Sequence, residues 1–205
     1  MTTTNIIETD QNLVKRALTA ENILAKVFPA LISNGNLEAM ERPDVVSDRF
    51  LDLNIIYKVD VEVGYIVVNE ALLVSVGLLP AKIREAAMRN AGKGVDIFSL
   101  GLFGIGGEDA VGSVVVTKEL GGYGAGSILD KDVLEMVRKR LGGDYFILPS
   151  SVHEVICMPL SETDDLEFLR ETVAMINRNE VAPNDRLSDT VYWYRDGAVQ
   201  IATDD

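Results

Sequence analysis

The chain has only one cysteine and one histidine in 205 residues. A single cysteine cannot form a disulfide within the chain, and the first residues, "MTTTNIIETDQN", lack the basic and apolar regions of a secretory signal. We therefore expect a cytoplasmic protein. One histidine and one cysteine supply at most two of the four ligands of a structural zinc site, so we predict no metal site. We expect no cofactor either.

Positive charge is also scarce, with 19 lysine and arginine residues against 32 aspartate and glutamate residues, a formal net charge of −13. Such a chain repels the phosphate backbone of nucleic acids, and its densest basic cluster, Arg138 to Arg140, complements the end of a helix. Long apolar runs are absent too, because Glu62, Asn69 and Glu70 interrupt the most apolar window, residues 61–83. We predict a protein that binds neither nucleic acid nor a membrane.

What is present is ordinary for a globular protein, with 47% apolar and 25% charged residues. Apolar residues spaced along one helical face predict a helix from Asp10 to Ile32, which Pro29 kinks or ends. The β-rich stretches between Phe50 and Asn69 predict a hairpin that turns at Gly64. Pro80 suits the first turn of a second helix. Four residues form the inner face of that helix: Ile83, Ala86, Ala87 and Asn90.

The second half of the chain alternates strands and helices. Ser113–Thr117 is predicted as a strand, and Lys131–Arg140 as a helix whose N-terminus is capped by Asp130. Two further strands, Asp144–Leu148 and Val152–Met158, should pair as an antiparallel hairpin.

A helix from Asp164 to Asn177 and a final strand or hairpin, "TVYWYRDGAVQIAT", complete the order β-α-β-β-α-β. We predict an α+β fold with a mixed, mainly antiparallel sheet whose helices pack on one face. Residues 1–98 hold the N-terminal helix, the hairpin and the second helix, residues 99–205 hold the βαββαβ-like half, and we expect one compact unit. Five apolar helix residues should be almost wholly buried: Leu134, Val137, Leu166, Leu169 and Val173.

Four stretches carry a family resemblance: "FLDLNIIYKV", "IVVNEALL", "VLEMVRKRLGGDYFILPSSVHEVICMP" and "NEVAPNDRLSDTVYWY". From about Val27 to Tyr194 the chain resembles an uncharacterised bacterial family, a domain of unknown function of anaerobic Gram-positive bacteria. The string from Leu148 to Ile156 is its most specific part. The resemblance implies a cytoplasmic bacterial protein, and it implies no reaction.

The only histidine lies in the stretch "LPSSVHEVI", beside two serines and a glutamate. The candidate catalytic residues are Ser150, Ser151, His153 and Glu154. In an extended strand Glu154 points away from the face that carries Ser151 and His153, and no Gly-x-Ser-x-Gly motif surrounds either serine. Three other acids could take its place: Asp52, Asp144 and Asp189. The structural alternative is a turn whose serines bond the local backbone.

Two glycine-rich stretches invite comparison with phosphate-binding loops. Residues 101–112 lack the Gly-x-Gly-x-x-Gly spacing and precede a strand rather than a helix. The second stretch lies between a strand and a helix, as a phosphate-binding loop should. Its candidate ligand-binding residues are Gly122, Gly124, Gly126 and Ser127. It has no lysine of the Walker type, and Glu119 and Asp130 flank it with negative charge, so a tight crossover explains its glycines equally well. An oxygen-ligand metal site at Ser161–Asp165 is a weaker explanation of those residues than helix capping.

Our leading prediction is a non-catalytic protein that acts by binding a protein partner or a second copy of itself as a homo-oligomer. Two alternatives stay open: a small hydrolase or transferase using Ser150 or Ser151 with His153, and nucleotide or phosphorylated-ligand binding at Gly122–Ser127. Burial of His153 among apolar side chains would favour a structural role, whereas a cleft within reach of a serine and a carboxylate would favour chemistry. An exposed Trp193 would mark a partner surface.

Overall fold

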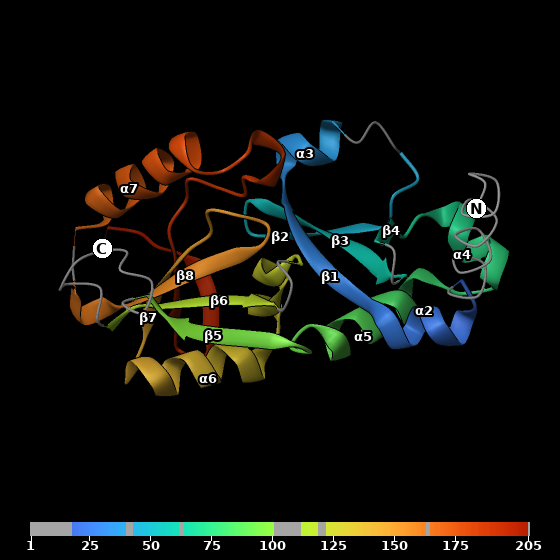
Figure 1. Ribbon diagram of the computed structural model, residues 1–205, viewed down its shortest axis with the longest axis horizontal. Helices are drawn as coiled ribbons and strands as arrows, with labels where there is room; N and C mark the ends of the chain where they lie inside the picture. The colour runs from blue at the N-terminus through green and yellow to red at the C-terminus, as the bar shows by residue number, and fades with distance from the viewer. Residues whose placement is uncertain are drawn as a thin grey trace, which may run out of the picture.

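The computed structural model describes six segments of the chain: residues 18–39, 43–61, 64–100, 112–118, 122–162 and 165–204. They form two sheets that lie side by side along the long axis of the molecule, with helices packed around both (Figure 1). Helices combine with antiparallel strand pairs throughout, which confirms the predicted α+β class. Within these segments, no helix is both long and apolar enough to cross a membrane.

The first sheet has four strands: β1 (Val27–Ser33), β2 (Ser47–Phe50), β3 (Leu53–Asp60) and β4 (Tyr65–Val67). β1 pairs with almost the whole length of β3 on one side, whereas β2 and β4 pair with the two ends of β3 on the other. The predicted hairpin is confirmed as β3 and β4. Its turn residue Gly64 has a φ of 143°, which residues with a side chain rarely adopt.

The prediction of a single helix from Asp10 to Ile32 is wrong, because its last residues form β1. The helix α2 spans only Ala20–Lys26 and β1 begins directly after it, while residues 10–17 lie outside the described segments. Every residue of β1 pairs with β3, and most are buried, so packing in a sheet outweighs the helical spacing of its apolar residues. Pro29 fits because β1 is an edge strand, where a residue without an N–H group is tolerated.

The helix α5 (Pro80–Asn90) packs on β1, and its four predicted inner residues are buried. The side-chain amide of Asn90 donates to the backbone carbonyl of Val27 at 2.7 Å and to those of Leu24 and Ala25 at 3.3 Å. These bonds satisfy a buried polar group and tie α5 to the C-terminal end of α2. Two shorter helices flank the strands of this sheet: α3 (Asn34–Ala39) and α4 (Glu70–Val76).

The second sheet has six strands in the order β10-β9-β7-β8-β6-β5, and every neighbouring pair is antiparallel. They are β5 (Val95–Ser99), β6 (Val114–Lys118), β7 (Tyr145–Leu148), β8 (Glu154–Pro159), β9 (Tyr192–Arg195) and β10 (Ala198–Ile201). The predicted pairing of β7 with β8 is confirmed, and the C-terminal stretch forms a hairpin. β5 is a strand that the sequence pattern does not predict, and the division suggested after residue 98 falls inside it. Trp193 of β9 is partly buried and packs against an apolar core.

Two longer helices pack on the second sheet: α6 (Lys131–Leu141) and α7 (Leu166–Asn179). The burial predicted for five of their residues is confirmed, since none is more than 7% exposed. The prediction that both helices pack on one face is wrong. Tyr145 and Ile147 of β7 belong to the core that contains α6, whereas Phe146 and Leu148 belong to the core that contains α7. In Figure 1, α6 accordingly lies below this sheet and α7 above it.

The strand order explains the two faces. α6 leads from β6 to β7 across β8, and α7 leads from β8 to β9 across β7, so both connections move the same way across the sheet. The two strands that α6 joins run opposite to the two that α7 joins. Crossovers of the usual right-handed type then place their helices on opposite faces.

A short 3₁₀ helix, η4 (Gly124–Leu129), lies at the junction of the two sheets. It contacts β1 of the first sheet and both β6 and β8 of the second. Side chains of both sheets, α5 and α6 form one large apolar core, and a smaller core lies between the second sheet and α7. The junction therefore holds the two sheets in a fixed relation, and several candidate site residues lie close to it.

Candidate functional site

Ser150, Ser151, His153 and Glu154 lie in the turn between β7 and β8 and at the start of β8. The Oγ of Ser151 accepts a hydrogen bond from the backbone N–H of His153 at 3.0 Å, which holds this turn. Both serines are buried. The expected separation of Glu154 from His153 assumes an extended strand, but the chain bends at Val152 and His153 before the strand begins, and His153 and Glu154 both line one cavity.

The imidazole of His153 faces an acid that the sequence did not indicate. Its Nε2 lies 3.6 Å from Oδ1 of Asp185, in the short 3₁₀ helix η6 (Pro183–Asp185). The backbone fixes this arrangement, because the carbonyl oxygen of Asp185 accepts a hydrogen bond from Val152 N–H at 2.8 Å. The other ring nitrogen, Nδ1, is buried and has no hydrogen-bond partner among the described residues. The structure thus brings the histidine to a carboxylate without a bond from its ring to Ser150 or Ser151.

Ser151→Ala should lower the free energy of unfolding by about 1 kcal/mol, because it removes the hydrogen bond that holds the turn. Ser75→Ala serves as the control, since Ser75 is exposed and bonds only a carbonyl of its own helix. Its loss should stay below about 0.5 kcal/mol. Urea unfolding measures both variants, and equal losses would contradict the structural role of Ser151.

The three alternative acids lie elsewhere, and each has other partners. Asp52 accepts hydrogen bonds from three hydroxyl groups near the start of β9. Asp144 is in an ion pair with an arginine of α6, and Asp189 accepts a hydrogen bond from an asparagine side chain of α7. Cys157 is buried, and burial raises the pKa of its thiol, so it stays protonated and is a poor nucleophile.

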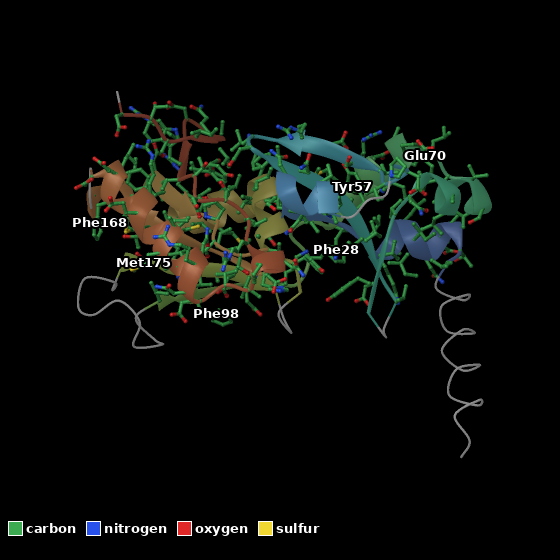
Figure 2. The ribbon with its side chains drawn as sticks, turned by 90° about the horizontal axis from the view of Figure 1, so that it is seen from above. Phe28, Tyr57, Glu70, Phe98, Phe168 and Met175 are labelled. Atoms are coloured by element: carbon green, nitrogen blue, oxygen red, sulfur yellow. The ribbon has the colours of Figure 1, made fainter. Side chains whose placement is uncertain are left out.

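A cavity of about 770 Å³ opens beside His153 and Asp185. α7 packs over β7 and β9 and leaves the rest of that face of the second sheet uncovered. This uncovered part of the sheet is the floor of the cavity. The C-terminal end of α7 forms one wall. Seven apolar residues line the cavity: Phe98, Leu100, Val115, Ile156, Ile176, Val181 and Ala182. We call it the sheet-face cavity, and its size is typical of binding sites. Figure 2 shows Phe98 on the half of the molecule that the second sheet forms.

The charged groups around the sheet-face cavity are mainly acidic. Glu154, Glu180 and Asp185 line it together with His153, whereas no lysine or arginine from the described segments does. The side chains of His153 and Asp185 are 38% and 41% exposed, so both can meet a ligand. A group that fills this cavity must present apolar surface to the floor and positive charge or hydrogen-bond donors to the rim.

A second cavity, of about 320 Å³, lies at the junction of the two sheets and shares Asp185 with the first. We call it the Lys58 cavity, because Lys58 of β3 lines it and places Nζ 3.4 Å from the centre of the Tyr123 ring. That ring also contacts Tyr65 and His153, with centroids 5.4 and 5.7 Å away. The backbone of Tyr123 has a φ of 22°, a conformation that residues other than glycine seldom adopt and that often marks functional sites.

The glycine-rich loop beside Tyr123 is packed against backbone. Gly124, Gly126 and Ser127 are buried in η4. A side chain at Gly124 would overlap the backbone of β6, and one at Gly126 would overlap the backbone of β1, while a Cβ at Gly122 would lie 2.5 Å from a tyrosine hydroxyl. The glycines therefore permit a close approach of chain segments. The N-terminus of α6 is occupied too, because Oδ1 of Asp130 accepts two of its backbone N–H groups.

In the part of the chain that the structure describes, no group of three or more histidine, cysteine or acidic side chains is placed to hold a metal ion. The stretch Ser161–Asp165 is described only in part, since residues 163 and 164 lie outside the described segments, as do residues 101–111 of the first glycine-rich stretch. Asp165 caps α7, because its Oδ1 accepts the backbone N–H of Phe168 at 2.9 Å.

Comparison with protein families concerns the second sheet and its helices. Residues 108–196 match the model of a family of unknown function, DUF5688. No curated protein and no solved structure matches the chain. The DUF5688 match contains β6 to β9 with α6 and α7, hence both His153 and Asp185, and leaves Lys58 outside. It confirms a resemblance to a family of unknown function over less than half of the chain. From Val27 to residue 107 the resemblance stays a prediction, as does the bacterial origin of the family.

Proposed function

We propose that this chain is a non-catalytic binding protein that holds a protein partner in the sheet-face cavity. The partner inserts an apolar side chain that lies beside a lysine or arginine. The observation that carries this proposal is the lining of the cavity, which combines an apolar floor with a rim of three carboxylates and one histidine. We also propose a bacterial, cytoplasmic setting, supported by the sequence resemblance and by the single, buried Cys157.

The floor of the cavity supports an apolar occupant. Phe98 is 38% exposed although it lies on a sheet face next to Val115, which is 8% exposed. Covering such apolar surface releases about 25 cal/mol for each Å² removed from water. Concave sites with exposed apolar side chains and a polar rim are typical of interaction surfaces.

The edge of the second sheet supports a different partner rather than a second copy. β5 is the edge strand beside the cavity. Arg140 donates hydrogen bonds to the carbonyl oxygen of Ile97 at 2.9 Å and to Oγ of Ser99 at 3.0 Å. A charged side chain bound along an edge strand discourages its pairing with the same strand of another molecule.

The surroundings of the imidazole support binding rather than hydrolysis. A serine nucleophile is activated by a hydrogen bond to its base. Among the described residues, neither ring nitrogen of His153 bonds a serine: Nδ1 has no partner, and Nε2 faces Asp185. His153 and Asp185 are placed instead to meet a cationic group at the cavity rim.

Three amphiphiles with the same eight-carbon chain test this proposal: n-octylammonium, n-octanol and n-octanoate. Octylammonium should bind at least about tenfold more tightly than octanoate, because three carboxylates line the cavity, and octanol should lie between them. Isothermal titration calorimetry of the full chain, below the micelle concentration, measures the three affinities. Tighter binding of octanoate, or no binding of any of them, would overturn the proposal.

Two variants, one at the C-cap of α7 and one within that helix, locate the effect. Glu180→Gln removes one rim charge and should weaken octylammonium binding about two- to fivefold while leaving octanol binding unchanged. Glu171→Gln is the matched control, since Glu171 is exposed on the same helix and lies outside the cavity. Equal losses in the two variants would show an effect of net charge alone and would contradict the assigned site.

A further inference from the structure

The Lys58 cavity contains a largely buried amine that, within the described segments, forms no ion pair with the carboxylate of Asp185 in the same cavity. Lys58 lies in the middle of β3, opposite Val67 of β4, and is only 9% exposed. Within the described segments its Nζ makes no hydrogen bond and no ion pair, and it lies over the face of the Tyr123 ring. Lysine is seldom buried in this way unless it is paired, so this amine needs an explanation.

The surroundings of Lys58 favour its neutral form. Burial lowers the pKa of Lys58 to about 8, although the charge of Asp185 opposes the shift. The ring of Tyr123 attracts an ammonium group but, unlike a carboxylate, brings no negative charge. A much larger share of this amine than of an ordinary lysine is therefore neutral and nucleophilic at pH 7.5.

The cavity beside this amine has room for a small molecule. Its volume is about 320 Å³, with apolar walls from Ile32, Ile56 and Val67. Asn36 and Asn184 form a polar side, held in place because Nδ2 of Asn36 donates to the backbone carbonyl of Asn184 at 2.7 Å. The carboxylate of Asp185 also lines the cavity, which disfavours an anionic ligand.

We propose that Lys58 is a covalent attachment site for a small, uncharged aldehyde or ketone, which it binds as an imine. The lone pair of Nζ attacks the carbonyl carbon, the C–O π bond breaks, and one proton passes from nitrogen to oxygen to give a carbinolamine. The hydroxyl group then leaves as water with the second nitrogen proton while the C=N bond forms. Asp185 can carry these protons, and the step needs no oxidant or reductant. This inference is independent of the proposed partner binding.

Reductive trapping tests the inference on the full chain. Propanal is added with sodium cyanoborohydride, which reduces an imine to a stable amine, and peptide mass mapping gives the labelling rate of each lysine. At pH 7.5, Lys58 should be labelled at least about tenfold faster than the exposed Lys82 and Lys93. The rate at Lys58 should level off above about pH 8, whereas exposed lysines become faster still. Labelling of Lys58 at or below the rate of the exposed lysines would overturn the inference.

Two further comparisons show whether the cavity causes this reactivity. Lys58→Arg keeps the positive charge but cannot form an imine, so the fast labelling should vanish while octylammonium binding stays unchanged. On the unaltered chain, the labelling of Lys58 relative to Lys93 should be greater with propanal than with the anionic glyoxylate, because Asp185 repels the latter. Equal ratios for the two aldehydes would contradict binding in this cavity, whether or not the variant folds.

Discussion

Leu169→Ala should lower the free energy of unfolding by about 2–5 kcal/mol. Leu169 is 3% exposed and lies in the core between α7 and the second sheet, together with Phe146 and Val173. Truncation removes buried apolar surface and leaves a cavity that the paired strands beneath cannot fill. Urea unfolding followed by the fluorescence of Trp193, the only tryptophan, measures the loss next to this core.

Phe168→Ala is the matched control on the same helix. Phe168 is 58% exposed, and Figure 2 places it with Met175 on the half of the molecule that contains α7. Although this substitution removes a larger side chain, it should cost less than about 1 kcal/mol, because the side chain already meets water. A larger loss for Phe168→Ala than for Leu169→Ala would mean that α7 buries the face that carries Phe168 instead.

Gly126→Ala should destabilise the protein by at least about 2 kcal/mol. A Cβ at this position would overlap the carbonyl oxygen of Pro29 in β1, and neither backbone can move without breaking the contact of η4 with the first sheet. The core shared by the two sheets would have to open. Circular dichroism and tryptophan fluorescence should report the loss in a single transition.

Gly143→Ala separates this clash from a general cost of replacing glycine. Gly143 follows α6, and a Cβ added there would meet no atom within 4 Å. Its loss should stay within about 0.5 kcal/mol. If Gly126→Ala were tolerated equally well, η4 would not be clamped between the sheets as the structure shows.

Local signals explain what the sequence could predict. Asp130 caps α6, and Gly142 ends it with a φ of 80°, so both boundaries depend on residues directly next to the helix. The prediction of a helix over the residues of β1 was wrong because these residues have helical spacing, and only pairing with β3 makes them a strand. The faces of α6 and α7 depend on strand order, which no local pattern contains.

In the candidate site, too, the sequence could indicate residues with a local signal but not contacts between distant segments. His153 and its neighbouring serines stand out in the sequence because the chain has no other histidine. Asp185 comes from a turn that is distant in the sequence, and backbone bonds such as the one to Val152 bring it to His153, so no signal near it could have indicated the pair. Lys58 had one usable signal, since a lysine interrupts the apolar stretch "NIIYKV" in the middle of a predicted strand.

Nuclear magnetic resonance of the ¹⁵N-labelled chain, titrated with n-octylammonium, tests most directly where the protein binds. The backbone amide signals that shift should cluster around the sheet-face cavity, at Val115, Ile156 and Val181, and octanoate at the same concentration should shift them less. Signals of the first sheet, such as that of Ile55, should stay in place. Shifts confined to other surfaces, or equal shifts with both amphiphiles, would contradict a site that recognises an apolar group beside a positive charge.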